Sequence, residues 1–163
     1  MIKVTKMKNI YILLLASFLI PICSAGQEYI EVNGKTIDKN GDPLNGKFFA
    51  YNDDGTLEHV YNYVNGLKEG EFISYYPGGK MMEKGFYTAG LKDGTWIRWN
   101  QNGQKTGEIT FSQGQRDGKW QIWNDKGILK CVMYYKKGDK TGIWEMFDDE
   151  GNLVQKESYG ESL

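Results

Sequence analysis

Six large rings in the second half of the chain have the residue types and spacing of a binding surface. They are Trp96, Trp99, Trp120, Trp123, Trp144 and Phe147. Rows of accessible rings bind sugars, quaternary ammonium groups or the hydrophobic anchors of a protein partner. The same rings can instead form the core, and both readings hold if some of them line a groove.

A row of basic residues is the second candidate surface. Its members are Lys68, Lys92, Arg116 and Lys140, evenly spaced along the chain. Such a row could contact lipid headgroups or an acidic partner. Glu69, Asp93 and Asp117 directly follow the first three and cancel much of the field. The sequence therefore favours a solvated edge over a basic binding site.

Catalytic and metal-binding residue sets are missing from the sequence. His59 is the only histidine, and we expect it to face solvent because Glu83, Gly107, Cys131 and Gln155 replace it at the equivalent points of the repeat described below. In the expected fold, His59 and Cys131 lie about 29 Å apart, which is too far for a nucleophile–base pair. Zinc would require more His and Cys ligands.

The acidic turns do not match a calcium loop. They contain Asp53-Asp54, Asp125 and Asp148-Asp149-Glu150, without the alternating Asp pattern and distal Glu of such a loop. We therefore predict no enzyme activity, no metal site and no cofactor.

These residues are positioned by a repeat of 24 residues. The unit begins at Gly46 and starts again at Gly70, Gly94, Gly118 and Gly142. A fixed period of this size indicates a repeat architecture. The five copies span 46–69, 70–93, 94–117, 118–141 and 142–163. We number repeat positions from the opening glycine as position 0.

Three repeat positions always hold a large ring. Position 2 is Phe48, Phe72, Trp96, Trp120 and Trp144. Position 5 is Tyr51, Tyr75, Trp99, Trp123 and Phe147. Position 17 is Tyr63, Tyr87, Phe111, Tyr135 and Tyr159. A thin sheet needs such rings, since each can bury about 150 Å² or more.

Glycines and polar residues divide each copy into two short segments. Position 9 is always glycine and follows polar residues, and position 20 is glycine in the first four copies. Both patterns are typical of tight turns. The intervening segments are rich in Tyr, Trp, Phe, Ile and Val, which favours strands. We therefore predict an all-β, single-layer, elongated antiparallel meander of stacked β-hairpins.

The spacing of the rings makes a prediction about register. If the first turn pairs position 5 with position 11, then positions 2 and 5 differ by an odd step and strict alternation places them on opposite faces. We expect either one β-bulge per copy or aromatic cover on both faces.

The repeat resembles the MORN repeat, and most closely its bacterial variant form. The segment from Tyr63 to Phe72 reads ring-x-N-G-x-x-x-G-x-ring, and the segments beginning at Tyr87, Phe111 and Tyr135 repeat the ring and glycine spacing. Position 23 departs from the common form, which has His there. The resemblance implies a MORN-like repeat solenoid that contacts proteins or membranes. Relatives of this form are often labelled antitoxin components.

The first 25 residues have the pattern of a secretory signal peptide. Lys3, Lys6 and Lys8 precede an apolar run over 10–22, and small residues follow it. The run is shorter than the roughly 20 residues of a membrane span. We expect a signal-peptide helix over 1–25 and an exported protein, in the periplasm, secreted or at the envelope. An uncleaved anchor and lipoprotein cleavage at Cys23 are the alternatives.

The remaining chain fits one domain with a short N-terminal cap over 26–45. In the cap we expect a hairpin around Asn33-Gly34 that protects the first edge strand. Without the three leader lysines, the formal net charge falls from −1 to −4, which argues against nucleic acid as a target.

The first functional hypothesis is an exported, non-enzymatic repeat protein that mediates protein–protein or envelope-surface contacts. The second is a glycan- or cell-wall-binding module, because choline-binding repeats also combine Trp and Tyr with Gly. The third is an antitoxin-like component of a toxin–antitoxin pair, which would require a cytoplasmic pool.

Overall fold

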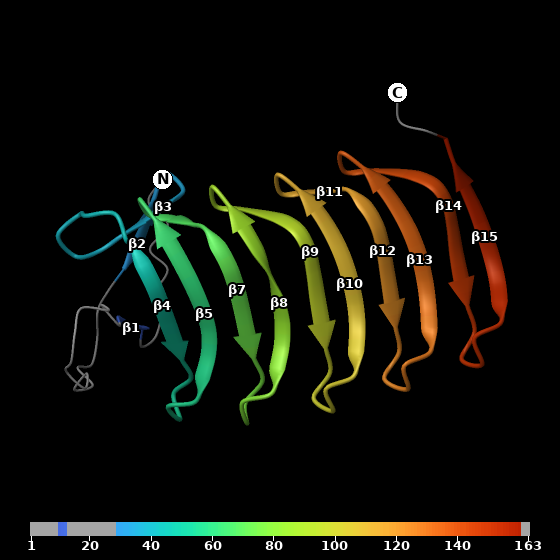
Figure 1. Ribbon diagram of the computed structural model, residues 1–163, viewed down its shortest axis with the longest axis horizontal. Helices are drawn as coiled ribbons and strands as arrows, with labels where there is room; N and C mark the ends of the chain where they lie inside the picture. Colours follow the sequence, from blue (N-terminus) through green and yellow to red (C-terminus); the bar gives the residue numbers. More distant parts are fainter. Residues whose placement is uncertain (1–9, 13–28, 161–163) are drawn as a thin grey trace.

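The protein is a long antiparallel sheet built from consecutive hairpins. The computed structural model describes residues 10–12 and 29–160. The main sheet has 13 strands, which lie in chain order from β4 to β15. Strand β1 pairs with the edge of β4 that faces away from β5. Figure 1 shows the strands side by side, with the N-terminal segment and the C-terminus at opposite ends. The predicted all-β meander is confirmed.

The repeated strands have closely similar bounds in each copy. They are β4 (Gly46–Tyr51), β5 (Leu57–Val64), β6 (Leu67–Lys68), β7 (Gly70–Tyr75), β8 (Met81–Thr88), β9 (Leu91–Trp99), β10 (Lys105–Ser112), β11 (Gln115–Arg116), β12 (Gly118–Trp123), β13 (Leu129–Lys136), β14 (Asp139–Phe147) and β15 (Leu153–Tyr159). The described part of the chain contains no helix long and apolar enough to cross a membrane.

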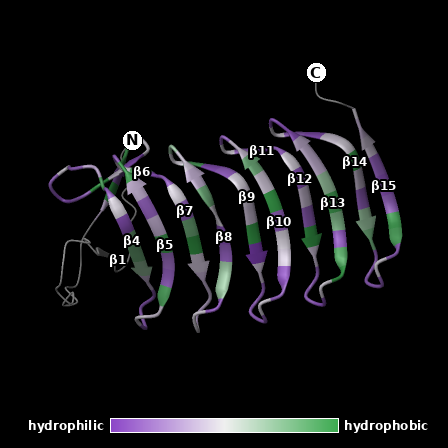
Figure 2. Cartoon of the chain, viewed as in Figure 1, coloured by the Kyte–Doolittle hydropathy of each residue, from purple (hydrophilic) through white to green (hydrophobic). Residues whose placement is uncertain are grey.

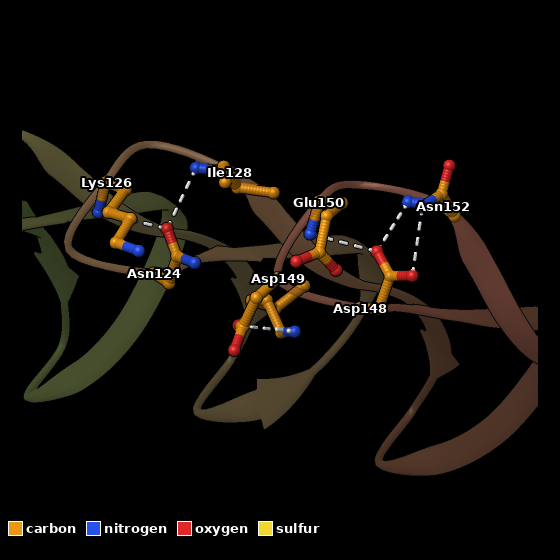
Figure 3. A network of polar contacts seen from close by, with 8 residues as sticks. Asn124, Lys126, Ile128, Asp148, Asp149, Glu150 and Asn152 are labelled. Atoms are coloured by element: carbon orange, nitrogen blue, oxygen red, sulfur yellow. Dashed lines mark hydrogen bonds and ion pairs between the residues drawn. The ribbon is translucent and has the colours of Figure 1, made fainter.

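The first turn of each copy is closed by its position-9 glycine. In the fourth copy, the Gly127 N–H donates to the carbonyl of Asn124 at 2.9 Å, and its φ is +80°. The Asn124 side chain accepts N–H bonds from Lys126 and Ile128, both at 3.0 Å. Figure 3 shows this turn beside the matching Asp148 turn of the fifth copy. These side-chain bonds explain why Asn or Asp opens most of the turns.

One β-bulge occurs in every hairpin, and the junctions β8–β9 and β13–β14 each contain a further register shift. Position 5 pairs with position 11, as in Tyr51 with Leu57, whereas position 4 pairs with position 13, as in Ala50 with His59. The other copies repeat this shift. The extra residue is position 12 on the second strand of each hairpin. Both expected alternatives occur: the bulge lies on the second strand of each hairpin, and the strand that carries positions 2 and 5 alternates regularly, so that their rings cover opposite faces.

The second turn of each copy packs against the next copy. Positions 19 and 20 both have positive φ, as in Ala89 (+50°) and Gly90 (+83°). Two such residues form the turn type that matches strand twist in a hairpin. The Gly90 N–H donates to the Lys68 carbonyl at 2.8 Å, and Gly114 and Gly138 make the same bond to Lys92 and Arg116. Neighbouring turns are thereby tied together.

The N-terminal segment differs in part from the prediction. Ile10–Ile12 forms strand β1, which pairs antiparallel with β4, instead of part of a helix. The rest of the expected signal peptide, including Cys23, lies outside the described residues. The cap contains the expected hairpin as β2 (Ile30–Val32) and β3 (Lys35–Ile37).

The cap extends the core at the first copy. Tyr29 and Leu44 are buried and form one cluster with Phe48, Ala50 and Tyr63. Tyr29 packs edge-on against Phe48 with ring centroids 5.8 Å apart. The cap residues therefore occupy the place that a preceding copy would fill.

Candidate functional site: an aromatic ladder and the opposite face

A continuous ladder of rings runs along one face of the sheet, which we call the ladder face. It consists of the position-2 and position-17 rings, in contact from Phe48 to Tyr159 with Tyr61 inserted near the start. Ring centroids lie 4.8 Å apart for Trp144 and Tyr159 and 6.3 Å apart for Trp96 and Phe111. Each copy contributes two rungs, so the ladder holds the copies together.

The tryptophans of the ladder also form hydrogen bonds with the backbone of the preceding copy. The Trp96, Trp120 and Trp144 indole N–H groups donate to the carbonyls of Phe86, Thr110 and Tyr134 at 3.2, 2.8 and 3.0 Å. Each acceptor is position 16 of the preceding copy. The first two copies have Phe48 and Phe72 at position 2 and cannot form this bond. The Trp side chains therefore fix the register between copies as well as filling space.

The six predicted binding rings separate into two groups. Trp96, Trp120 and Trp144 are ladder rings; Trp96 is fully buried and Trp144 is 6% exposed. Trp99, Trp123 and Phe147 are half-buried position-5 rings outside the ladder. Since they directly follow position 4 in a regular strand, alternation places them on the opposite face, which we call the outer face.

The basic row lies over the ladder. Lys92 Nζ is 3.5 Å from the centre of the Trp96 ring, and Lys140 Nζ is 4.4 Å from Trp144. Lys68 covers Tyr61 at 4.3 Å, and the Arg116 guanidinium carbon lies 5.4 Å from Trp120. Each of these cations also approaches a position-17 ring. The structure thus joins two residue sets that appear unrelated in the sequence.

The expected solvated basic edge is wrong for the first half of the row. Lys68 and Lys92 are partly buried, and burial is the main cause that lowers the pKa of each ammonium group. Burial also raises the pKa of the neighbouring Tyr87 to about 12. Arg116 and Lys140 are exposed, as expected. Cations over ring faces are stabilised most where water is excluded, which favours the buried pair.

The acidic residues that follow the basic row have a structural role. Glu69, Asp93 and Asp117 accept the backbone N–H of Ala89, Gln113 and Lys137 in the next copy, at 2.8, 3.2 and 3.1 Å. Those N–H groups belong to the left-handed residues of the second turn. The carboxylates support the turns, a role that the charge-cancelling interpretation missed.

The expected solvent exposure of His59 is also wrong. Its ring contacts Tyr61 and Phe72, with centroids 5.5 and 5.8 Å away, and its side chain is 24% exposed. Burial lowers the pKa of the imidazole, and Nδ1 has no hydrogen-bond partner among the described residues. The facing Ser74 Oγ is likewise buried and unpartnered there. Position 13 lies on the ladder face, so variation between copies did not indicate exposure.

No group of His, Cys, Asp and Glu with metal-binding geometry occurs among the described residues. Cys131 lies in β13 and His59 in β5, with five strands of the sheet between them. The structure therefore does not bring these two side chains together.

The outer face exposes large apolar side chains that sequence reasoning did not select. Phe86, Tyr134 and Ile143 are 48%, 37% and 52% exposed. Each directly precedes a ladder ring, so strand alternation points it to the outer face. Figure 2 shows that the strands of the sheet carry both apolar and polar residues. Their signal in the sequence was the large apolar residue immediately before a ladder ring.

The repeat family follows from this geometry and from a direct comparison. The family model described as MORN repeat variant matches residues 68–89, 92–113 and 140–160. The chain is a MORN repeat protein. The copies between and before the matched MORN segments have the same bulge and the same register. A search of curated proteins finds no match.

MORN repeats generally mediate contacts with proteins or membrane lipids, and the family is typically non-enzymatic. The family model that matches is that of the variant form, which is the form that the ring and glycine spacing resembles.

Proposed function

We propose that this MORN repeat protein is an exported, non-enzymatic scaffold that binds a protein partner through its outer face. One observation carries the proposal: the ladder face is filled by its own rings and cations, whereas the outer face presents Phe86, Tyr134 and Ile143 to solvent. Tyr134 and Ile143 lie on the neighbouring strands β13 and β14, and contiguous exposed apolar surface is typical of interaction sites.

The neighbouring outer-face residues favour a protein over a lipid surface. Tyr134 pairs with Lys119, and Phe86 pairs with Glu71, which forms an ion pair with Lys84 at 2.7 Å. Apolar anchors surrounded by charges of both signs fit the centre and rim of a protein interface. An anionic membrane would select a predominantly basic face instead.

The covered rings of the ladder favour a protein partner over a glycan. A sugar-binding ring presents a free face, but Trp96 is fully buried and Lys92 lies over its ring. Trp144 is covered by Lys140 in the same manner. These contacts leave the outer face as the better-supported surface.

Affinity capture from the envelope fraction tests the interaction. The triple variant Phe86→Ser, Tyr134→Ser, Ile143→Ser should lose most of the captured partner while its circular dichroism and melting temperature stay near those of the wild type. Lys119→Ser is the matched control, because it changes an exposed residue of the same face without removing an apolar anchor. Unchanged capture by a folded triple variant would reject the outer face as the site.

Export rests on the leader pattern and needs its own test. The intact mass of the protein purified from its natural host should correspond to a chain that lacks about the first 25 residues. Cell fractionation should place it outside the cytoplasm. A full-length cytoplasmic pool would contradict export and would favour the antitoxin-like alternative.

A further inference from the structure

The C-terminal end of the sheet is an open strand edge. Strand β15 pairs with β14 and with no other described strand, and Figure 1 places it at the end of the sheet away from the N-terminal segment. Its first four residues are exposed, with Val154 62% exposed. An unpaired edge of this length is a template for another strand.

The repeat defines how a strand would dock there. At each of the four junctions between copies, position 13 pairs with position 4 of the next copy, and position 14 pairs with position 3. The pairs are His59–Ser74 and Val60–Ile73, Glu83–Arg98 and Lys84–Ile97, Gly107–Ile122 and Glu108–Gln121, and Cys131–Met146 and Val132–Glu145. By the same register, Gln155 and Lys156 would face positions 4 and 3 of an incoming antiparallel strand.

The edge retains the groups that an incoming tryptophan uses. In the junctions before the third, fourth and fifth copies, the position-16 carbonyl accepts a Trp indole N–H from the following copy. The equivalent position in the fifth copy is Ser158, and by the same register we infer that its carbonyl faces away from β14. Each interior position-17 ring from Tyr87 onward contacts a Trp ring of the following copy, whereas Tyr159 has Trp144 on one side only among the described ladder rings.

Charge adds a further preference. Lys156 forms an ion pair with Glu145 at 2.8 Å, and Glu145 occupies position 3 of the fifth copy. An incoming strand would place its own position-3 residue on the free side of Lys156. An acidic residue directly after the tryptophan therefore fits this edge best.

We propose that the β15 edge binds an extended segment of a partner protein with the pattern basic-x-Gly-x-Trp, preferably followed by Glu or Asp. The glycine supplies the positive φ found at position 0 of every copy. The tryptophan donates to the Ser158 carbonyl and packs on Tyr159, and the basic residue covers the tryptophan as Lys92 covers Trp96.

A second copy of this chain fits the edge less well. Its first strand, β4, has Phe48 at position 2, which has no N–H to donate. Phe48 also already contacts Tyr29 of the cap. The occupant is therefore a different protein, and the site is separate from the outer face proposed above.

A synthetic peptide tests the edge directly. The probe has the sequence of Lys140–Phe147, Lys-Thr-Gly-Ile-Trp-Glu-Met-Phe, with a fluorophore, and it is titrated with the full-length protein by fluorescence anisotropy. We expect saturable binding. The matched peptide with Ala in place of Trp should bind at least about tenfold more weakly, because it lacks both the ring and the indole donor.

A second test changes the protein instead of the peptide, and it uses a variant whose loss of binding cannot be attributed to unfolding. Appending the turn sequence 136–141 and then a sixth copy with the sequence of 118–141 after Tyr159 should abolish peptide binding and raise the melting temperature, because the added copy occupies the edge. Tyr159→Ser should weaken binding in a chain whose circular dichroism is unchanged. The outer-face triple variant should bind the peptide normally, which separates this test from that of the proposed function.

Three outcomes would overturn the proposal. They are equal binding of the Trp and Ala peptides, undiminished binding to the six-copy protein, and concentration-dependent dimerisation that protects the β15 amides from hydrogen exchange. The last result would assign the edge to a second copy.

Discussion

Gly85 and Trp96 form the closest contact between a backbone position and a ladder ring. A Cβ at Gly85 would lie 2.2 Å from the Trp96 ring, which is fully buried and cannot move aside. Position 15 holds Tyr61, Ile109, Met133 and Glu157 in the other copies, so the glycine is specific to this contact. One small residue thus admits the largest ring into the centre of the ladder.

Gly85→Ala should therefore destabilise the protein by about 1–3 kcal/mol, the usual cost of overpacking a rigid core. Urea unfolding followed by tryptophan fluorescence measures the change. Gly107→Ala is the control, because its Cβ would meet Arg98 at an ordinary 3.6 Å. Equal effects of the two substitutions would show that Trp96 relaxes easily.

His59 should make the stability of the protein depend on pH. Its folded-state pKa is lowered mainly by burial, so below about pH 6.5 the unfolded chain takes up the proton first. The stabilisation present above that pH is lost as the pH falls toward the folded pKa. The free energy of unfolding of the wild type should fall more between pH 7.5 and pH 5 than that of His59→Phe. Parallel curves for the two proteins would contradict a buried neutral imidazole.

At the scale of the element, the second turn holds its position-19 residue in an unfavourable left-handed backbone conformation. Position 19 has a φ near +50° in every described turn, yet only the first copy has Asn there, as Asn65. Ala89, Gln113 and Lys137 adopt the same left-handed conformation, which disfavours a side chain with an ordinary Cβ. The carboxylate of the preceding copy helps to hold the conformation by accepting the N–H group.

Lys137→Asn should stabilise the protein by about 0.5–1 kcal/mol, because Asn tolerates this conformation better. Thermal unfolding measures the gain. Lys126→Asn is the matched control: it makes the same exchange at an exposed turn residue whose φ is not positive. If Lys137→Asn gives no gain over this control, the turn is not strained.

At the scale of the molecule, each copy contacts mainly its neighbours through one repeated junction. All four junctions have the same register, so no copy depends on a distant one. Stability in such an array is close to a sum of copies and junctions. The two ends differ, since the cap covers the first copy and no described strand pairs with the far side of β15.

Removal of the middle copy, residues 94–117, should therefore leave a folded protein. The deletion joins Asp93 to Gly118 and rebuilds a normal junction. The urea m-value should fall by about one fifth, in proportion to the surface exposed on unfolding. Deletion of 94–105 is the control, because half a copy reverses the strand direction and should prevent folding. A half-copy deletion as stable as the full deletion would refute the repeat as the unit of folding.

The period and the two turns could be derived from residue order alone, because ring and glycine spacing is a local constraint on strand direction. The ring spacing left a bulge and aromatic cover on both faces as alternatives. The MORN resemblance followed from the same spacing, and the family comparison agrees with it. What could not be derived was the relation between rows. Lys92 and Trp96 are four residues apart in β9, but the register shift against β8 falls within this stretch, and the tertiary structure places the ammonium group over the ring.

The sequence by itself thus determined the repeated hairpin and the family, since both follow from residue types and spacings within one unit of about 24 residues. Tertiary structure decided which rings are core and which side chains face outward. Burial of His59 and exposure of Phe86 depend on the phase of the pleat, which the bulge in each copy resets. A one-residue shift in that phase exchanges the faces, so composition at a repeat position could not reveal them.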